Sequence, residues 1–131
     1  MKKFFYKLKV FYEDTDAGGV VYYANYLKFF ERARTEMLSE LSLSNKILSE
    51  NFKILIIVKS CNIEYKKPAK LEDNLEVVSW ITSYSSTSFK MKQEVIRNGE
   101  LITECNIHLV TVDEKGRPTK TPLDLQNKLF D

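Results

Sequence analysis

The sequence predicts an α+β fold in which one long central helix is wrapped by a curved, mainly antiparallel sheet of five strands. Two observations predict this class. Residues 24–42 have helical periodicity without an internal glycine or proline, and five segments with alternating apolar residues surround them. The later strands follow one another with hairpin-type links, which favours antiparallel pairing. The 131 residues, 44% apolar and 29% charged, suit a single domain spanning residues 1–131.

The first strand, the loop after it and the helix follow in that order. Residues 3–12 alternate between apolar side chains and lysines, as in a half-buried strand. The polar segment 13–19, EDTDAGG, ends in two glycines and predicts a loop. Residues 24–42 then predict a helix about 30 Å long, with a further turn over 44–50. The side chains expected on its covered face are Leu27, Phe30, Ala33, Met37, Leu38 and Leu41.

The second half of the chain predicts four strands and a short final helix. The strands are Ile54 to Lys66, Asn74 to Tyr84, a segment around 89–95, and Leu101 to Asp113, and the tail 122–130 is the expected helix. Asn98-Gly99 is a strong signal for a two-residue hairpin. A single long helix wrapped by such a sheet is the hotdog arrangement. One helix leaves a sheet edge unprotected, so we expect a homodimer or a homotetramer made of paired dimers.

Composition and charge exclude several classes of function. The formal net charge of +2 does not predict nucleic-acid binding, which requires a strongly basic face. The absence of a His or Cys cluster predicts no metal site. The only histidine, His108, lies in the last strand and has no evident nucleophile to serve.

The expected location is the cytoplasm. Lys7 and Lys9 interrupt the apolar N-terminal stretch, so it does not predict a signal peptide. The longest aliphatic run, 54–58, is too short for a transmembrane segment. Cys61 and Cys105 form no CxxC pair, and we expect two buried free thiols in a reducing compartment.

The loop before the helix carries the strongest functional signal. Its carboxylates stand directly before two glycines and a helix N-terminus, where backbone N–H groups near Tyr22, Tyr23 and Ala24 lack helical partners. A thioester carbonyl placed there would be polarised, and one such donor contributes about 2.7–4 kcal/mol to lowering a barrier. The alternative reading is a solvated acidic loop whose charges favour the helix start.

The stretch 10–38, VFYEDTDAGGVVYYANYLKFFERARTEML, closely resembles the 4-hydroxybenzoyl-CoA thioesterase family, and is most similar to its Tol-Pal-associated (YbgC-like) acyl-CoA thioesterases. The motif Tyr12-x-x-Thr15-Asp16-x-x-Gly19-x-Val21 carries the resemblance, which continues in IEYKKPAKLEDNLEV at 63–77. It implies a hotdog fold, acyl-CoA hydrolysis, no metal or redox cofactor, and active sites formed between subunits.

The resemblance also implies roles for individual residues. Asp16 matches the catalytic aspartate, Gly19 the glycine that shapes the approach, and Tyr23 the position whose backbone N–H is the oxyanion donor. Many Tol-Pal-associated members carry histidine where this chain has Tyr23. A phenol with an ordinary pKa near 10 cannot replace histidine as a base at neutral pH, so only the backbone role carries over unaltered.

The remaining candidates are substrate-binding residues, and each has a structural alternative. Tyr22 and Tyr26 are candidates for the acyl pocket, where bulky rings favour short-chain or aromatic acyl groups, although aromatic residues at helical spacing also suit a core. Val20, beside Gly19, is a further candidate for substrate binding. The candidates for binding the CoA moiety are Lys59, Ser85, Thr87, Ser88 and Lys90. Surface lysines also keep strand edges from aggregating.

The leading hypothesis is therefore an acyl-CoA thioesterase with Asp16 as nucleophile or general base, acting on CoA or acyl carrier protein thioesters. The alternative is a non-catalytic hotdog module that binds acyl carriers or partner proteins.

Overall fold

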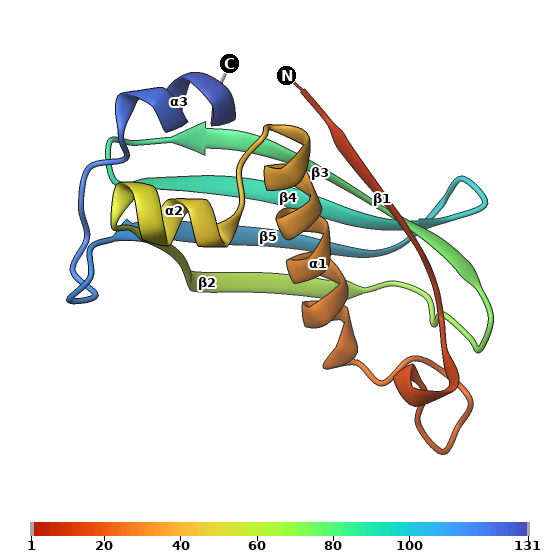
Figure 1. Cartoon of the computed structure of the whole chain (residues 1–131). Helices are drawn as coiled ribbons and strands as arrows, with labels where there is room; N and C mark the ends of the chain where they lie inside the picture. The colour runs from red at the N-terminus through yellow and green to blue at the C-terminus, as the bar shows by residue number, and fades with distance from the viewer. Residues whose placement is uncertain (1, 131) are drawn as a thin grey trace.

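One antiparallel sheet curves around a long helix, as the sequence predicts for the hotdog arrangement (Figure 1). The computed structural model describes residues 2–130. The strands are β1 (Phe4–Lys9), β2 (Leu55–Tyr65), β3 (Asn74–Tyr84), β4 (Ser88–Arg97) and β5 (Glu100–Val112). The helices are α1 (Asn25–Glu40), α2 (Asn45–Phe52) and α3 (Leu123–Leu129), and a 3₁₀ turn, η1 (Tyr12–Asp14), follows β1.

The strand order is β1-β3-β4-β5-β2, and every neighbouring pair is antiparallel. β1 and β2 therefore form the two edges of the sheet. The hairpin between β4 and β5 turns at Asn98 and Gly99, whose φ values of +51° and +80° confirm the predicted two-residue turn. This topology brings the 66–73 loop and the β4–β5 turn to one end of the sheet.

The long helix α1 crosses the sheet and supplies much of the core (Figure 1). Its buried side chains are Tyr26, Phe29, Phe30, Ala33, Met37 and Leu38. The expectation that Leu27 lies on the covered face is wrong, because 47% of this residue is exposed and Tyr26 and Phe29 fill the core instead.

The helix is also shorter than predicted, since its 16 residues extend about 24 Å. Ser42 adopts a φ of +60°, and the Leu43 N–H donates to the Leu38 carbonyl at 2.8 Å. The Ser42 N–H donates to the Ser39 carbonyl at 3.0 Å. These two bonds form a Schellman motif, which ends the helix before residue 42 although no glycine is present.

The two short helices complete the cover of the sheet. The predicted turn over 44–50 is the helix α2, which begins after Ser44, whose hydroxyl accepts the Ile47 N–H at 3.0 Å. The predicted tail helix is α3, which buries Leu125 and Leu129. Phe130 stacks on Tyr84 of β3 with ring centroids 4.2 Å apart. The tail is thereby held against the sheet.

The two cysteines differ in environment. Cys105 on β5 is buried, as predicted, but Cys61 on β2 is exposed, so the expectation of two buried thiols is wrong for Cys61. The reason is the strand order, which makes β2 an edge strand.

None of the helices within the described part of the chain has the length and apolar character needed to cross a bilayer.

Candidate active site

Residues 15–21 form a small β-hairpin, here called the 15–21 hairpin. Thr15 and Val21 pair as an antiparallel bridge, and the Asp16 N–H donates to the Val20 carbonyl at 2.9 Å. The Gly19 N–H donates back to the Asp16 carbonyl at 3.0 Å, and Gly19 has a φ of +79°. This is a tight turn closed by a residue in the left-handed region, a position that favours glycine.

Asp16 lies exposed at the start of this turn, with one carboxylate oxygen fixed. Its Oδ1 accepts the Gly18 N–H at 2.8 Å. A Cβ added at Gly18 would lie 3.3 Å from that oxygen, so this close approach also depends on glycine. Oδ2 has no hydrogen-bond partner among residues 2–130. The side chain is thus oriented by one bond and keeps an oxygen available for chemistry.

The N-terminus of α1 follows the hairpin and offers two free donors. Tyr22 is not one of them, because its N–H donates to the Asp14 carbonyl at 3.0 Å. The same carbonyl accepts Nδ2 of Asn25 at 2.9 Å. Within the described residues, the N–H groups of Tyr23 and Ala24 have no acceptor. The predicted set of three donors is therefore reduced to Tyr23 and Ala24.

The 66–73 loop anchors the hairpin and helix start to the sheet. The Val21 N–H donates to the Ala69 carbonyl at 2.8 Å, and Val20 bridges to Lys70. The Ala69 N–H donates to the hydroxyl of Tyr26 at 3.3 Å. Tyr26, a predicted substrate-binding residue, is only 3% exposed and its hydroxyl bonds to this loop. Hairpin, helix and loop therefore form one connected unit.

Arg97, at the end of β4, fixes the same loop through its guanidinium group. Its Nη1 donates to the Pro68 carbonyl and to Oδ2 of Asp73, both at 2.9 Å. Burial alone would raise the pKa of Asp73, but the Lys70 N–H and the Arg97 guanidinium outweigh it and hold the pKa below its ordinary value. Arg97 Nη2 also donates to Oε1 of Glu100 at 3.3 Å, which completes the network.

An aromatic pocket of about 260 Å³ opens beside Tyr23. The Tyr65 hydroxyl donates to the Tyr23 carbonyl at 3.2 Å, and the rings of Tyr65 and Tyr26 lie 5.5 Å apart. Lys66 and Lys67 complete the rim. Tyr65 is not among the predicted site residues, although the segment 63–77 that contains it carries part of the family resemblance.

The predicted CoA-binding residues lie elsewhere in the chain. Ser85, Thr87 and Ser88 form the β3–β4 turn, where the Ser85 and Ser88 hydroxyls bond at 2.8 Å. This turn is at the opposite end of β3 and β4 from the 15–21 hairpin. Lys59 lies exposed at a bulge in the edge strand β2, and Lys90 lies exposed near the start of β4. Within one chain, they are not brought together with Asp16.

The 15–21 hairpin, the α1 N-terminus and the aromatic pocket thus place a carboxylate, two free N–H donors and an apolar recess in one region. Of the predicted site residues, the structure gathers Asp16, Gly19, Val20, Tyr22, Tyr23 and Tyr26 there. The side chain of Tyr22 is 45% exposed and its ring centroid lies 5.0 Å from that of Tyr23. A carboxylate near polarising backbone donors suits attack on a carbonyl group.

Comparison with known proteins finds similar enzymes over almost the whole chain. The acyl-CoA thioester hydrolase YbgC of Escherichia coli O6:H1 is 40% identical over 121 residues, which cover 91% of this chain and 90% of that protein. The acyl-CoA thioesterase YbgC of Haemophilus influenzae is 37% identical over 124 residues, which cover 94% of this chain and 91% of that protein.

Comparison with solved structures also finds thioesterases. The solved structure of a 1,4-dihydroxy-2-naphthoyl-CoA thioesterase from Synechocystis matches with a TM-score of 0.91 at 25% identity, over 99% of this chain and 97% of that one. The model of the thioesterase-like superfamily matches residues 10–129. These findings confirm the family resemblance and the hotdog fold predicted from the sequence, and the chain belongs to the thioesterase-like superfamily.

Proposed function

We propose that this protein hydrolyses the thioester of a short-chain or aromatic acyl-CoA at the N-terminus of α1. The observation that carries the proposal is the junction of hairpin and helix, where Asp16 precedes the free N–H groups of Tyr23 and Ala24. Two relatives named acyl-CoA thioesterase or thioester hydrolase support CoA as the carrier. The free thiols of Cys61 and Cys105 support a reducing compartment such as the cytoplasm.

The proposed chemistry starts with the thioester carbonyl oxygen accepting the Tyr23 N–H. Asp16 takes a proton from water as the water oxygen attacks the carbonyl carbon, and negative charge develops on the carbonyl oxygen. The C–S bond then breaks, CoA leaves as its thiolate and takes up a proton, and the acyl group leaves as a carboxylic acid. In the second route, Asp16 attacks the carbonyl carbon directly, the C–S bond breaks, and CoA leaves as its thiolate and takes up a proton. Water then hydrolyses the resulting mixed anhydride, which releases the carboxylic acid and regenerates the Asp16 carboxylate.

Asp16→Asn tests the assignment. The amide retains an oxygen that can accept the Gly18 N–H, so the fold is kept, but it cannot act as base or nucleophile. We expect kcat to fall by about 10²–10⁴-fold, measured as thiol release from a panel of acyl-CoAs. Glu13→Gln makes the same chemical change on a neighbouring exposed side chain and should retain activity. Equal activity of Asp16→Asn and the wild type would exclude the proposed role.

Tyr23→Phe separates the backbone from the side chain. The variant keeps the N–H donor and loses only the hydroxyl, so we expect most of the activity to remain. A fall of a hundredfold or more in a folded variant would show that the phenol takes part. If the wild type releases no thiol from any acyl-CoA or acyl carrier protein thioester, that result favours the alternative of a non-catalytic binding module.

The working unit that we propose is a homodimer, or a tetramer of such dimers. The edge strand β2 exposes Leu55, Ile57 and Val58 by 44–47%. An apolar edge strand is a template for pairing, and twofold antiparallel β2–β2 pairing would bring the 85–88 turn of a second copy to the same end as Asp16. This would reconcile the predicted CoA-binding residues with the 15–21 hairpin.

Light scattering tests this assembly. Ile57→Lys should convert the dimer to a monomer and lower activity, because a charge on the pairing edge opposes association. Phe5→Lys, on the strand at the opposite edge, should leave the dimer intact. A wild-type protein that is monomeric at micromolar concentration would contradict the proposal.

A further inference from the structure

Asn25 is the first residue of α1 and directly follows the two free N–H donors of the candidate active site. Its Nδ2 donates to the Asp14 carbonyl at 2.9 Å, and the backbone N–H of Tyr22 donates to the same oxygen at 3.0 Å. The free N–H groups of Tyr23 and Ala24 lie between these two residues. A single carbonyl oxygen therefore holds the chain on both sides of the proposed oxyanion donors.

The residue that provides this carbonyl is itself fixed. Asp14 is 8% exposed, and its N–H donates to the Phe11 carbonyl at 2.9 Å. Its Oδ2 accepts the Phe11 N–H at 2.8 Å. Asp16 follows two residues later, at the start of the tight turn. A bond from α1 to the Asp14 carbonyl therefore constrains the position of the helix start relative to Asp16.

The bond requires the amide of Asn25, because only its nitrogen can donate. A carbonyl oxygen can only accept, so the nitrogen of this amide faces Asp14. An aspartate would have almost the same shape, but its ionised carboxylate has only acceptor oxygens and would repel the carbonyl. The side chain is half-buried, so water does not freely replace this contact.

No second side chain repeats the contact. Among residues 2–130, Asn25 makes the only side-chain hydrogen bond between α1 and the segment 11–16. The N-cap residue Ala24 has no capping side chain, and the first turn of α1 contains no acid. The groups that ordinarily occupy the free N–H donors of a helix start are therefore missing from this one, and the polar side chain that is present bonds to Asp14 instead.

We propose that Asn25 is a positioning residue for the thioester hydrolysis, a role that rests on the proposed function. Asn25 holds the N–H donors of Tyr23 and Ala24 at a fixed distance from Asp16, and it acts through the Asp14 carbonyl without touching the reacting atoms. The carbonyl oxygen of the substrate must stay on its donor while Asp16 acts at the carbonyl carbon. A misplacement of about 1 Å can lower the rate on the order of a hundredfold.

The first test removes the donor in two ways in the full-length protein. Asn25→Ala deletes the amide, and Asn25→Asp keeps its shape. We expect kcat, measured as thiol release from the acyl-CoA that the wild type hydrolyses fastest, to fall about 10–100-fold in both variants. KM should stay within about threefold of the wild-type value, because the groups that bind substrate are unchanged. Circular dichroism checks the fold.

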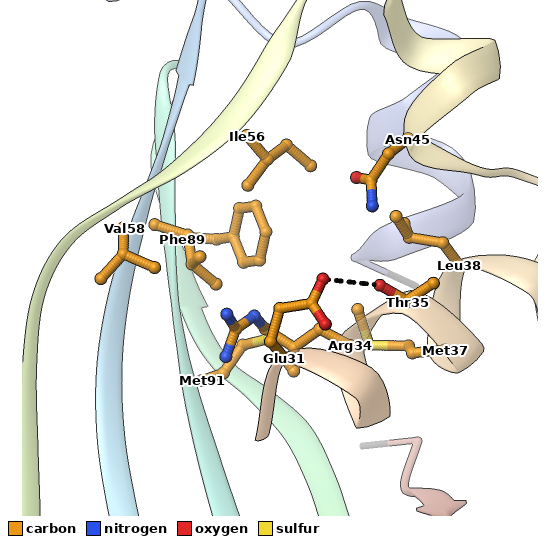
Figure 2. Close-up of a pocket in the computed structure, with 11 residues that line it drawn as sticks. Glu31, Arg34, Thr35, Met37, Leu38, Asn45, Ile56, Val58, Phe89 and Met91 are labelled. Atoms are coloured by element: carbon orange, nitrogen blue, oxygen red, sulfur yellow. Dashed lines mark hydrogen bonds between the residues drawn. The ribbon is translucent and has the colours of Figure 1, made fainter. Parts of the chain in front are cut away.

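Asn45, the first residue of α2, provides the matched control. Figure 2 shows its side chain at the start of α2 without a hydrogen bond to the other residues drawn. Asn45→Ala and Asn45→Asp make the same chemical changes at the same helix position and should keep the wild-type kcat. Wild-type kcat in either folded Asn25 variant, or an equal fall in the matching Asn45 variant, would overturn the proposal.

A double-mutant cycle with Asp16→Asn separates positioning from general support of the fold. If Asn25 places the donors relative to Asp16, loss of its amide should matter little once Asp16 can no longer act as base or nucleophile. We therefore expect Asn25→Ala to lower kcat by less than about threefold in the Asp16→Asn background. The same fold-loss in both backgrounds would refute the positioning role.

The two proposals fail in different ways. If the wild type releases no thiol from any acyl-CoA, the proposed hydrolysis and the role of Asn25 are both refuted. If Asp16→Asn lowers kcat strongly while both Asn25 variants match the wild type, the hydrolysis stands and the positioning role alone is refuted.

Discussion

Tyr26→Phe isolates the hydrogen bond that ties α1 to the 66–73 loop. Tyr26 is 3% exposed, and its hydroxyl accepts the N–H of the fully buried residue Ala69 at 3.3 Å. Phenylalanine fills almost the same volume but leaves this N–H without an acceptor. The Val21 N–H still donates to the Ala69 carbonyl in the variant, so the 15–21 hairpin keeps its other anchor.

The expected cost follows from the length of the bond. A buried donor without a partner costs about 1–3 kcal/mol. A 3.3 Å bond is near the long limit for a hydrogen bond, which places this loss near the lower end, about 1 kcal/mol. A chain of 131 residues unfolds with an entropy of roughly 0.28 kcal/mol/K, so the melting temperature should fall by about 4 °C.

The difference should shrink at alkaline pH. Burial raises the pKa of Tyr26 above its ordinary value of 10.0, while the Ala69 N–H acts in the opposite direction. The folded chain therefore holds this proton more tightly than the unfolded chain. The resulting stability is present below the unfolded pKa and is lost as pH rises through the folded pKa. Wild type should lose more stability above pH 10 than Tyr26→Phe.

Urea unfolding of both proteins at equal concentration, at neutral pH and above pH 10, measures these differences. The kcat/KM for one acyl-CoA should change little, because the hydroxyl bonds to the loop. If Tyr26→Phe unfolds at the wild-type urea concentration, the bond contributes nothing measurable. If kcat/KM falls more than tenfold while stability is unchanged, the hydroxyl contacts substrate and the structural reading of Tyr26 is refuted.

Two further substitutions and one labelling experiment test other features. Gly19→Ala should destabilise by about 1–2 kcal/mol in urea unfolding. Apart from its two chain neighbours, no residue from 2 to 130 has a heavy atom within 4 Å of the added Cβ, so a φ of +79° is the whole cause, and wild-type stability would contradict it. Burial raises the pKa of Cys105 to about 11, so iodoacetamide at pH 8 should modify Cys61 and spare Cys105, as read by peptide mass. Arg97→Met should cost about 1 kcal/mol at pH 7. The lowered pKa of Asp73 means that this loss should diminish as pH falls below its unfolded pKa.

Local sequence patterns predict most helices and strands of this fold. The end of α1 and the order of the strands depend on tertiary contacts, which these patterns do not encode. β3 begins and ends at Asn74 and Tyr84, as its alternation predicts, because each face of a strand is encoded in neighbouring residues. The end of α1 is different, since Ser42 adopts a left-handed conformation that a serine does not predict. The strand order, which exposes Cys61, likewise depends on pairings between distant segments.

In the candidate site, too, the sequence predicts some features, and others depend on tertiary contacts. The family motif locates Asp16 and Gly19, and the structure gathers both at the helix start. The motif does not predict that the Tyr22 N–H already donates a hydrogen bond, because its acceptor, the Asp14 carbonyl, is brought to it by the folding of residues 14–22.

The position of β2 at the sheet edge also shapes how the chain folds during synthesis. Within residues 2–130 of one chain, β2 pairs only with β5, and residues 66–99 must be made before β5 begins. At about 5–20 residues per second, this segment takes about 2–7 s to emerge from the ribosome. Throughout that time the aliphatic strand has no partner on either side. Newly made chains are therefore most prone to aggregation before β5 appears, and a chaperone that shields residues 55–65 during this interval should raise the yield of folded protein.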